Sequence, residues 1–170
     1  DILPKLENMG LSVLSELPFE VQAEGNTKSV WIHDFSLKLP GGGKDSIAVP
    51  DIKDIFESCF LAIWRGQTDN DRLNALSISS GIEWRQVALL RTIVRYMNQM
   101  RLPYKAPYIT QVLNAHPAIA GQLFTLFDTM LNPDVKRSKD KEKSIMDGLQ
   151  TALNDVPILD HDRVIRVALN

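Results

Sequence analysis

Apolar and polar side chains alternate with a strand-like period only between residues 11 and 39. Two such runs flank the polar turn AEGNTK, residues 23–28, and their β-type side chains are Phe19, Val21, Val30, Ile32 and Phe35. Two runs around a Gly-Asn turn predict a β-hairpin. Before them, residues 2–10 predict a short helix that ends at Gly10. A helix followed by two strands is half of a small α+β sandwich and cannot bury its sheet alone.

After residue 50 the apolar positions repeat with the period of a helix. Residues 51–64 carry one stripe with the i, i+3, i+4, i+7 spacing, and Gly66 ends this helix. A longer helix, about 83–101, has an apolar half made of Val87, Leu89, Leu90, Ile93, Val94, Tyr96, Met97 and Met100. An apolar half-circumference contacts several neighbours, so this helix is predicted to be the centre of a bundle. Further helices are predicted at about 107–115, 117–131, 138–154 and from 160 to the end.

The pattern therefore predicts an α+β fold that is mainly α. A helix and a hairpin occupy residues 1–40, and a bundle of about six helices occupies residues 51–170. Between them, residues 41–50 read as a linker, because two prolines enclose three consecutive glycines and several polar residues.

Composition narrows the class of protein. The 170 residues are 44% hydrophobic and 24% charged, with a net charge of −2 and one cysteine, which is typical of a globular protein in a reducing compartment. No apolar run approaches the ~20 residues that span a bilayer, and the first residues do not form a signal peptide. We expect a cytoplasmic protein without a membrane partner. The chain begins without methionine and ends in mid-pattern after Leu169, so we expect part of a longer polypeptide.

Two short motifs imitate ligand loops. The sequence GGGK ends at Lys44, but Asp45 follows instead of Ser or Thr, so the linker interpretation is favoured over a phosphate loop. The sequence DNDR, residues 69–72, starts like a calcium loop, yet Asn74 and Ser80 stand where that loop needs Gly and Glu. We interpret it as a helix-capping loop.

The histidines and the cysteine do not suggest catalysis. His33, His116 and His161 lie in separate segments without metal-ligand spacing, and His116 precedes a proline as a turn or capping residue would. The carboxylates of DHD, residues 160–162, are explained by a helix N-terminus. Cys59 lies on an apolar helical stripe, which predicts a buried, inert thiol. We therefore predict no catalytic, cofactor-binding or metal-binding residue in this chain.

The stretch from residue 64 to residue 91 holds two Trp-Arg pairs. Trp64 lies beside apolar neighbours and is predicted to be buried between helices, and Trp84 lies at a helix start. Cations outnumber anions from residue 65 to residue 105, so a helix-turn-helix-like module that binds nucleic acid remains an alternative function. Its reading face would be formed by Arg85, Arg91 and Arg95. The negative net charge argues against a nucleic-acid partner.

Several motifs, in order, resemble one family. AIWRGQTDNDRLN, SGIEWRQVALLR, HPAIAGQLFTLFD and VPILDHDRVIRVALN are similar to the large-subunit NAD-dependent glutamate dehydrogenases of bacteria. LPKLENMGLSVLSELPFEV and VWIHDF resemble the third ACT-like domain of that family. The resemblance covers essentially the whole chain and is poorest in the linker and at residues 132–144. His161 stands where an acidic residue is expected.

The resemblance implies a non-catalytic role for this segment. It would run from the third ACT-like domain into the first helical motif before the catalytic domain. The parent enzyme would convert glutamate, NAD and water to 2-oxoglutarate, ammonia and NADH, with its catalytic and NAD-binding residues after residue 170. The expected partners are the catalytic and other regulatory domains of the same polypeptide, in a homo-oligomer.

Overall fold

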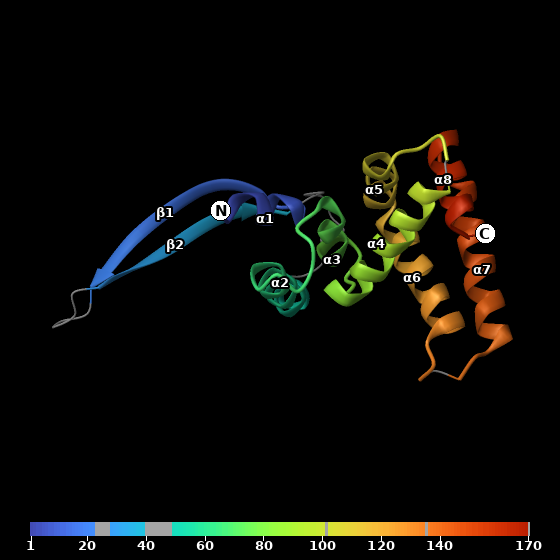
Figure 1. The fold of residues 1–170 in the computed structure, drawn as a ribbon, viewed down its shortest axis with the longest axis horizontal. Coiled ribbons are helices and arrows are strands. Elements are labelled where there is room, and N and C mark those ends of the chain that lie inside the picture. Colours follow the sequence, from blue (N-terminus) through green and yellow to red (C-terminus); the bar gives the residue numbers. More distant parts are fainter. Residues whose placement is uncertain (23–27, 40–48, 101, 135, 170) are drawn as a thin grey trace.

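The computed structural model describes residues 1–22, 28–39, 49–100, 102–134 and 136–169. A long two-stranded hairpin extends from one end of the molecule, and helices make up the rest (Figure 1). The turn predicted at 23–28 and the linker predicted at 41–50 lie largely outside the described residues. The predicted fold class, α+β and mainly α, is confirmed.

The hairpin follows a short helix, α1 (Leu3–Asn8). Gly10 has φ 83°, and the Leu11 N–H donates to the carbonyl of Leu6 at 3.1 Å, which closes the helix end. A residue with a Cβ would be strained there, so the predicted stop at Gly10 is confirmed.

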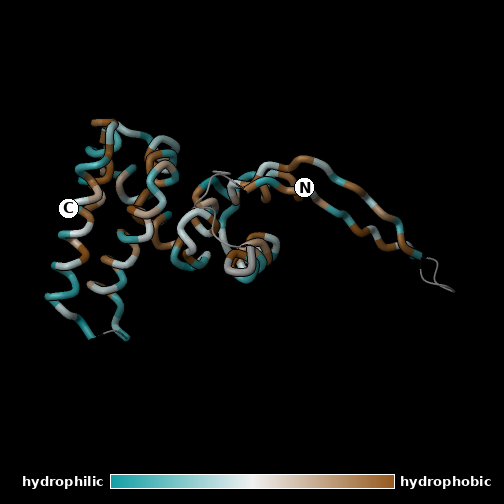
Figure 2. Tube along the Cα trace, turned by 180° about the vertical axis from the view of Figure 1, so that it is seen from behind, coloured by the Kyte–Doolittle hydropathy of each residue, from teal (hydrophilic) through white to brown (hydrophobic). Residues whose placement is uncertain are grey.

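Strands β1 (Ser12–Gln22) and β2 (Ser29–Lys38) pair antiparallel, with a register shift between Val13 and Ser15. Beyond the shift, Phe19 lies opposite Ile32. Since cross-strand partners and alternate residues share a face, one face of the sheet is nearly all apolar. We call it the outer face, and it consists of Leu17, Phe19, Val21, Val30 and Ile32. Its side chains are 47–63% exposed, and hydrophobic residues recur along the arm in Figure 2.

The predicted helices are confirmed within two residues at each end. They are α2 (Val49–Trp64), α4 (Trp84–Gln99), α5 (Ala106–Ala115), α6 (Pro117–Leu131), α7 (Lys139–Asn154) and α8 (Leu159–Leu169). Pro107 and Pro117 stand in first turns, where a missing N–H costs little. A 3₁₀ turn, η1 (Arg72–Asn74), and the short helix α3 (Ala75–Ser79) that continues it were not predicted from the sequence.

Two apolar cores hold these elements together. The helical core joins α4 to α8 with two leucines from η1 and α3; its largest fully buried side chains are Leu73, Leu76, Leu90, Met97, Ile109, Leu123, Leu149, Leu153 and Ile165. The second, which we call the junction core, consists of Leu6, Met9, Leu11, Ile52, Cys59, Ile63 and Ile78. It joins α1, α2 and α3, and Val13 and Phe35 pack against it from the base of the hairpin. Phe35 lies on the face opposite the outer face, so the junction core meets that face only at the base of the hairpin, and Trp31 farther along the same face is 55% exposed.

Two predictions about apolar side chains are wrong. Trp64 is 58% exposed instead of buried, because it is the last residue of α2 and its ring lies over Phe60 at the edge of the junction core. The ammonium of Lys5 lies 5.4 Å from the Trp64 ring. On α4 only half of the predicted apolar arc is buried, and Tyr96 and Met100 are 63% and 48% exposed.

Candidate functional site

A buried arginine is the most distinctive polar feature of the helical region. Arg91 lies in the middle of α4 and is only 5% exposed. Its Nε donates to Asp71 Oδ2 at 2.6 Å, and its Nη2 donates to Asp71 Oδ1 at 3.1 Å and to Asn74 Oδ1 at 2.8 Å. Its Nη1 donates to Thr68 Oγ1 at 3.1 Å. We call these four residues the Arg91 network; it satisfies the bidentate geometry that guanidinium and carboxylate groups share.

The loop that carries the partners of Arg91 is shaped by its own sequence. Gly66, with φ 68°, ends α2, and Gln67 N–H donates to the carbonyl of Ala62 at 2.9 Å. Asp71 Oδ1 then accepts from the N–H of Leu73 at 3.0 Å and caps η1. The predicted capping role of the 69–72 loop is thus confirmed. The same carboxylate caps one element and binds the guanidinium of another, so the loop is held against α4.

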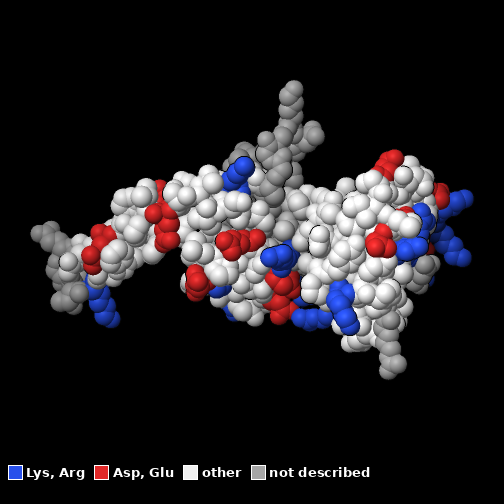
Figure 3. All heavy atoms as spheres, turned by 90° about the horizontal axis from the view of Figure 1, so that it is seen from above, with Lys and Arg blue, Asp and Glu red and all other residues white. Residues whose placement is uncertain are grey.

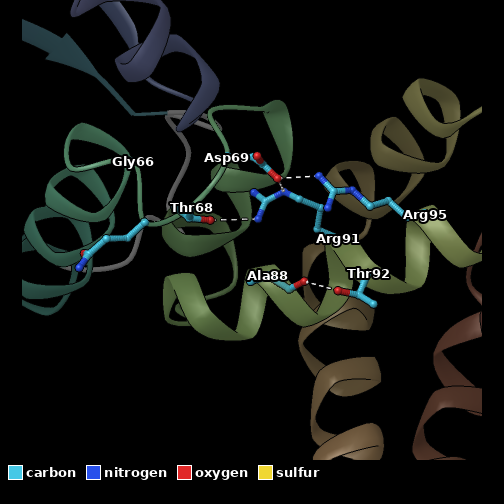
Figure 4. Close-up of a pocket in the computed structure, with 8 residues that line it drawn as sticks. Gly66, Thr68, Asp69, Ala88, Arg91, Thr92 and Arg95 are labelled. Carbon is cyan, nitrogen blue, oxygen red and sulfur yellow. Dashed lines mark hydrogen bonds and ion pairs between the residues drawn. The ribbon is translucent and has the colours of Figure 1, made fainter.

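A cavity of about 270 Å³ lies beside this network. Figure 4 shows Thr68, Asp69, Arg91 and Arg95 around it, with the two arginines coming from α4 and the other two from the loop. Arg95 Nη2 donates to Asp69 Oδ2 at 2.6 Å, and both of these side chains are more than half exposed. Two cations therefore face the two anions Asp69 and Asp71, and the cavity has no surplus charge with which to attract an ionic ligand.

The structure does not contain the predicted nucleic-acid-binding face of Arg85, Arg91 and Arg95. Arg91 was predicted to be part of an exposed reading face, but it is buried and bound to Asp71. Arg95 is paired with Asp69, and the guanidinium of Arg85 lies 4.3 Å from the ring of Trp84. On the face seen in Figure 3, blue and red side chains of the described residues are interspersed along the molecule. Nothing here supports the helix-turn-helix-like alternative.

The structure brings together two histidines that the sequence places 45 residues apart. His116 Nε2 and His161 Nδ1 are 3.0 Å apart, and the edge of one ring meets the face of the other. His116 forms the turn between α5 and α6, and His161 is 8% exposed in the first turn of α8. Burial, and next the charge of His161, lower the pKa of His116. One nitrogen of the pair must donate and the other accept, so the contact is lost when both rings are doubly protonated.

Cys59 is fully buried in the junction core, as predicted. The hydroxyl of Ser77 donates to its Sγ at 3.5 Å. Burial raises the pKa of this thiol, with a smaller opposing effect from the Ser77 hydrogen bond, so the reactive thiolate is disfavoured.

Among the described residues, the remaining candidates His33 and the pair Asp160 and Asp162 lie in different parts of the molecule. Lys44 lies outside the described residues. His33 lies on the hairpin, 2.6 Å from a carboxylate oxygen of Glu16. Asp160 and Asp162 stand in the first turn of α8 and pair with arginines of the same helix, Arg163 and Arg166. Among the described residues no group of three or more His, Cys, Asp or Glu side chains is arranged to hold a metal ion. In this described part, no helix combines the length and the apolarity needed to cross a membrane.

The chain matches two family models. Residues 1–49 match the model described as "Glutamate dehydrogenase, ACT3 domain", and residues 68–133 match "Glutamate dehydrogenase, helical motif 3". The first match covers α1 and the hairpin, and the second covers η1, α3, α4, α5 and α6. In the name of the second model, the helical motif of residues 68–133 is numbered as the third.

Curated relatives give the same result over nearly the whole chain. The chain is 36% identical over 166 residues to the NAD-specific glutamate dehydrogenase of Halomonas elongata, and 36% identical over 170 residues to that of Pseudomonas aeruginosa. It is 32% identical over 177 residues to that of Mycobacterium tuberculosis. These alignments cover 97–98% of the chain but only 10% of the length of each relative.

Proposed function

Because the chain belongs, as a segment, to the large NAD-specific glutamate dehydrogenases, we propose that it is a non-catalytic scaffold of such an enzyme. In this role it links an ACT-like unit, residues 1–40, through a linker at 41–50 to a helical unit at 51–170. The helical unit leads in turn to the catalytic domain, which lies elsewhere in the longer polypeptide.

The observation that carries this proposal is the junction core. Met9 comes from the ACT3 match and Ile78 from the helical-motif match, and both are nearly inaccessible to solvent at 0% and 3% exposure. Helix α2, which lies between the two matches, contributes Cys59 to the same core. At the surface, Asn8 Nδ2 donates to Asn70 Oδ1 at 3.1 Å. Close-packed interiors transmit displacement, so the two family segments move together.

The full-length protein then oxidises glutamate with NAD and water to 2-oxoglutarate, ammonia and NADH. The segment itself supplies no catalytic residue and no NAD-binding residue, and NAD binds to the catalytic domain. The partners of the segment are the catalytic and the other regulatory domains of its own polypeptide, in a homo-oligomer.

The uncovered hairpin fits this role. A two-stranded hairpin is marginally stable by itself, and an apolar face such as the outer face normally lies against another layer. Other regulatory segments of the same polypeptide supply that layer, since the chain spans only a tenth of its relatives.

Full-length enzyme with Met9→Asp tests the scaffold role. A carboxylate in the junction core should weaken the packing of α1 against α2 and α3. This weakening is measured as faster hydrogen exchange in α2 and α3. Glutamate oxidation should fall, whereas the affinity for NAD should remain that of the unchanged enzyme.

Glu7→Asp is the matched control, because it places the same new side chain on α1 at an exposed position. Unchanged exchange and unchanged turnover in the Met9→Asp enzyme would refute the scaffold role. A full-length protein without NAD-dependent glutamate oxidation would refute the proposed activity.

A further inference from the structure

Helix α4 has an apolar side that the described chain covers only in part. Its buried stripe, Val87, Leu90, Val94 and Met97, enters the helical core. A second stripe at helical spacing, Leu89, Ile93, Tyr96 and Met100, lies beside it and stays partly or largely exposed. The apolar arc of this helix is thus wider than the stripe that the chain buries fully, which is typical of a helix with a further neighbour.

The exposed stripe forms one wall of a groove of about 410 Å³. Phe127 and Leu131 at the end of α6 form a second wall, and Leu131 is 67% exposed. The lining contains no charged side chain, and the hydroxyl of Thr92 is already bonded to the carbonyl of Ala88 at 3.0 Å. Contiguous exposed apolar surface of this kind marks an interaction site, and a groove between helices accepts the apolar face of another helix.

The third wall indicates which segment fills the groove. Val167 and Ala168, in the last turn of α8, lie at its edge. A polypeptide that continues beyond α8 therefore leaves the helix next to the groove. A tethered segment with so short a connection binds at a high effective concentration, which an untethered partner lacks.

We propose that the groove between α4, α6 and the end of α8 holds an apolar helical face of the polypeptide that follows Asn170 in the full-length enzyme. The inference rests on the proposed function, because only a longer polypeptide supplies this occupant. Helix α4 then has two roles. The side that carries Arg91 binds the loop before η1, and the side that carries Tyr96 binds the polypeptide that follows Asn170.

Photo-crosslinking in the full-length enzyme tests the assignment. The photoreactive residue p-benzoyl-phenylalanine replaces Tyr96, whose side chain is mostly exposed in this chain and is similar in shape. Irradiation should give a cross-link within one polypeptide, and peptide mass spectrometry should map it to residues after Asn170. The same residue in place of Trp64, which is 58% exposed on α2, is the control and should not capture that peptide.

Each other outcome contradicts the proposal. A cross-link between two polypeptides would assign the groove to a second copy, for example to its hairpin. A cross-link to residues before Asp1 would assign it to a preceding domain, and the absence of any cross-link would mean that the groove faces solvent.

A second variant checks the contact itself. Met100→Glu places a carboxylate at the end of the groove and should lower the cross-link yield at position 96; an unchanged yield would contradict the proposal. The position of the cross-link does not depend on turnover. A full-length protein that forms it but does not oxidise glutamate would therefore refute the proposed activity and leave the groove assignment intact.

Discussion

The hairpin and the helical region place charge and apolar surface in opposite ways. In the helical region a guanidinium, that of Arg91, is 5% exposed, whereas on the hairpin the apolar side chain of Val30 is 63% exposed. Arg91 tolerates burial because four hydrogen bonds and the charge of Asp71 replace its water. The exposure of Val30 to water is unfavourable, because the burial of an apolar side chain lowers the free energy.

This difference separates the parts of the molecule whose packing partners all lie within the chain from the parts whose partners lie elsewhere. A polar group that is buried with all its partners belongs to a packed unit whose members are all present. An apolar face without a cover belongs to a unit whose other members are elsewhere. By this criterion the loop before η1 and the Arg91 side of α4 have all their partners within the chain, whereas the outer face of the hairpin and the Tyr96 side of α4 do not.

The strongest way to break this contrast is Arg91→Met. Methionine keeps much of the apolar stem but removes every donor, so the carboxylate of Asp71 keeps only the N–H of Leu73, and the amide oxygen of Asn74 loses the guanidinium. Loss of a partner from a buried polar group costs about 1–3 kcal/mol, and this range applies here because the Asp71 carboxylate is itself 39% exposed. We expect chemical denaturation to show this loss in the free energy of unfolding.

Arg95→Met is the matched control. Arg95 also pairs with an aspartate of the same loop, but it is 65% exposed, and exposed pairs contribute about 0–1 kcal/mol. Equal losses for the two variants would mean that Arg91 is not buried in solution.

The histidine pair should make the helical region sensitive to acid. The pKa of His116 is lower in the folded chain than in the unfolded chain, because of burial and next because of His161. The unfolded chain therefore takes up a proton near its ordinary pKa of about 6.5, before the folded chain does. The resulting stability is present above that pH and is lost as the pH falls through the folded pKa.

Urea unfolding at a series of pH values measures this slope. His116→Gln should flatten it between about pH 6.5 and the folded pKa. A slope that is identical in the two proteins would assign the acid sensitivity to other groups.

A smaller effect is expected for Trp64→Ala. Large losses follow when a buried aromatic leaves a cavity, but Trp64 lies at the edge, stacked on Phe60 and under the ammonium of Lys5. Exposed cation–π contacts and aromatic pairs each contribute about 0.5–1 kcal/mol. Thermal unfolding should show a loss of this size, and a loss of several kcal/mol would mean that the ring is inserted between helices.

The smallest effect in this chain is expected for Val30→Thr on the outer face. The two side chains are similar in shape and both suit a strand, so the change should stay within about 0.5 kcal/mol. In the full-length enzyme, where we propose a cover on this face, a buried hydroxyl without a partner should cost more. Comparison of the two unfolding free energies measures that cover, and equal values would mean that the face remains open.

Local patterns predicted the secondary structure well, because the spacing of apolar residues in each helix follows the surface that it buries. The hairpin was predicted from two β-type runs. The ends of two helices were predicted from Gly10 and Gly66, because glycine favours the backbone conformation that ends a helix. The pair η1 and α3 was missed, since three and five residues are too few to display a period.

Pairwise contacts could not be predicted in the same way. Arg91 was assigned to an exposed face by its residue type, and the spacing of residues along the helix does not show that Asp71, twenty positions earlier, folds back onto it. Trp64 has apolar neighbours in sequence, but it stands on the last turn of α2, beyond the reach of the junction core. The pairing of His116 with His161 likewise depends on how α8 returns to the α5–α6 turn.

Because Cys59 is buried in the junction core, its reactivity can be used to measure local opening of the native protein. It is the sole sulfhydryl of the chain and lies where the hairpin unit meets the helices, out of contact with solvent. A water-soluble disulfide reagent can reach it only during a transient opening, and a local opening exposes it without global unfolding. When labelling is faster than reclosing, the labelling rate equals the opening rate of the native protein. Labelling of this one residue thus reports how often the junction between the hairpin and the helices opens in the native protein.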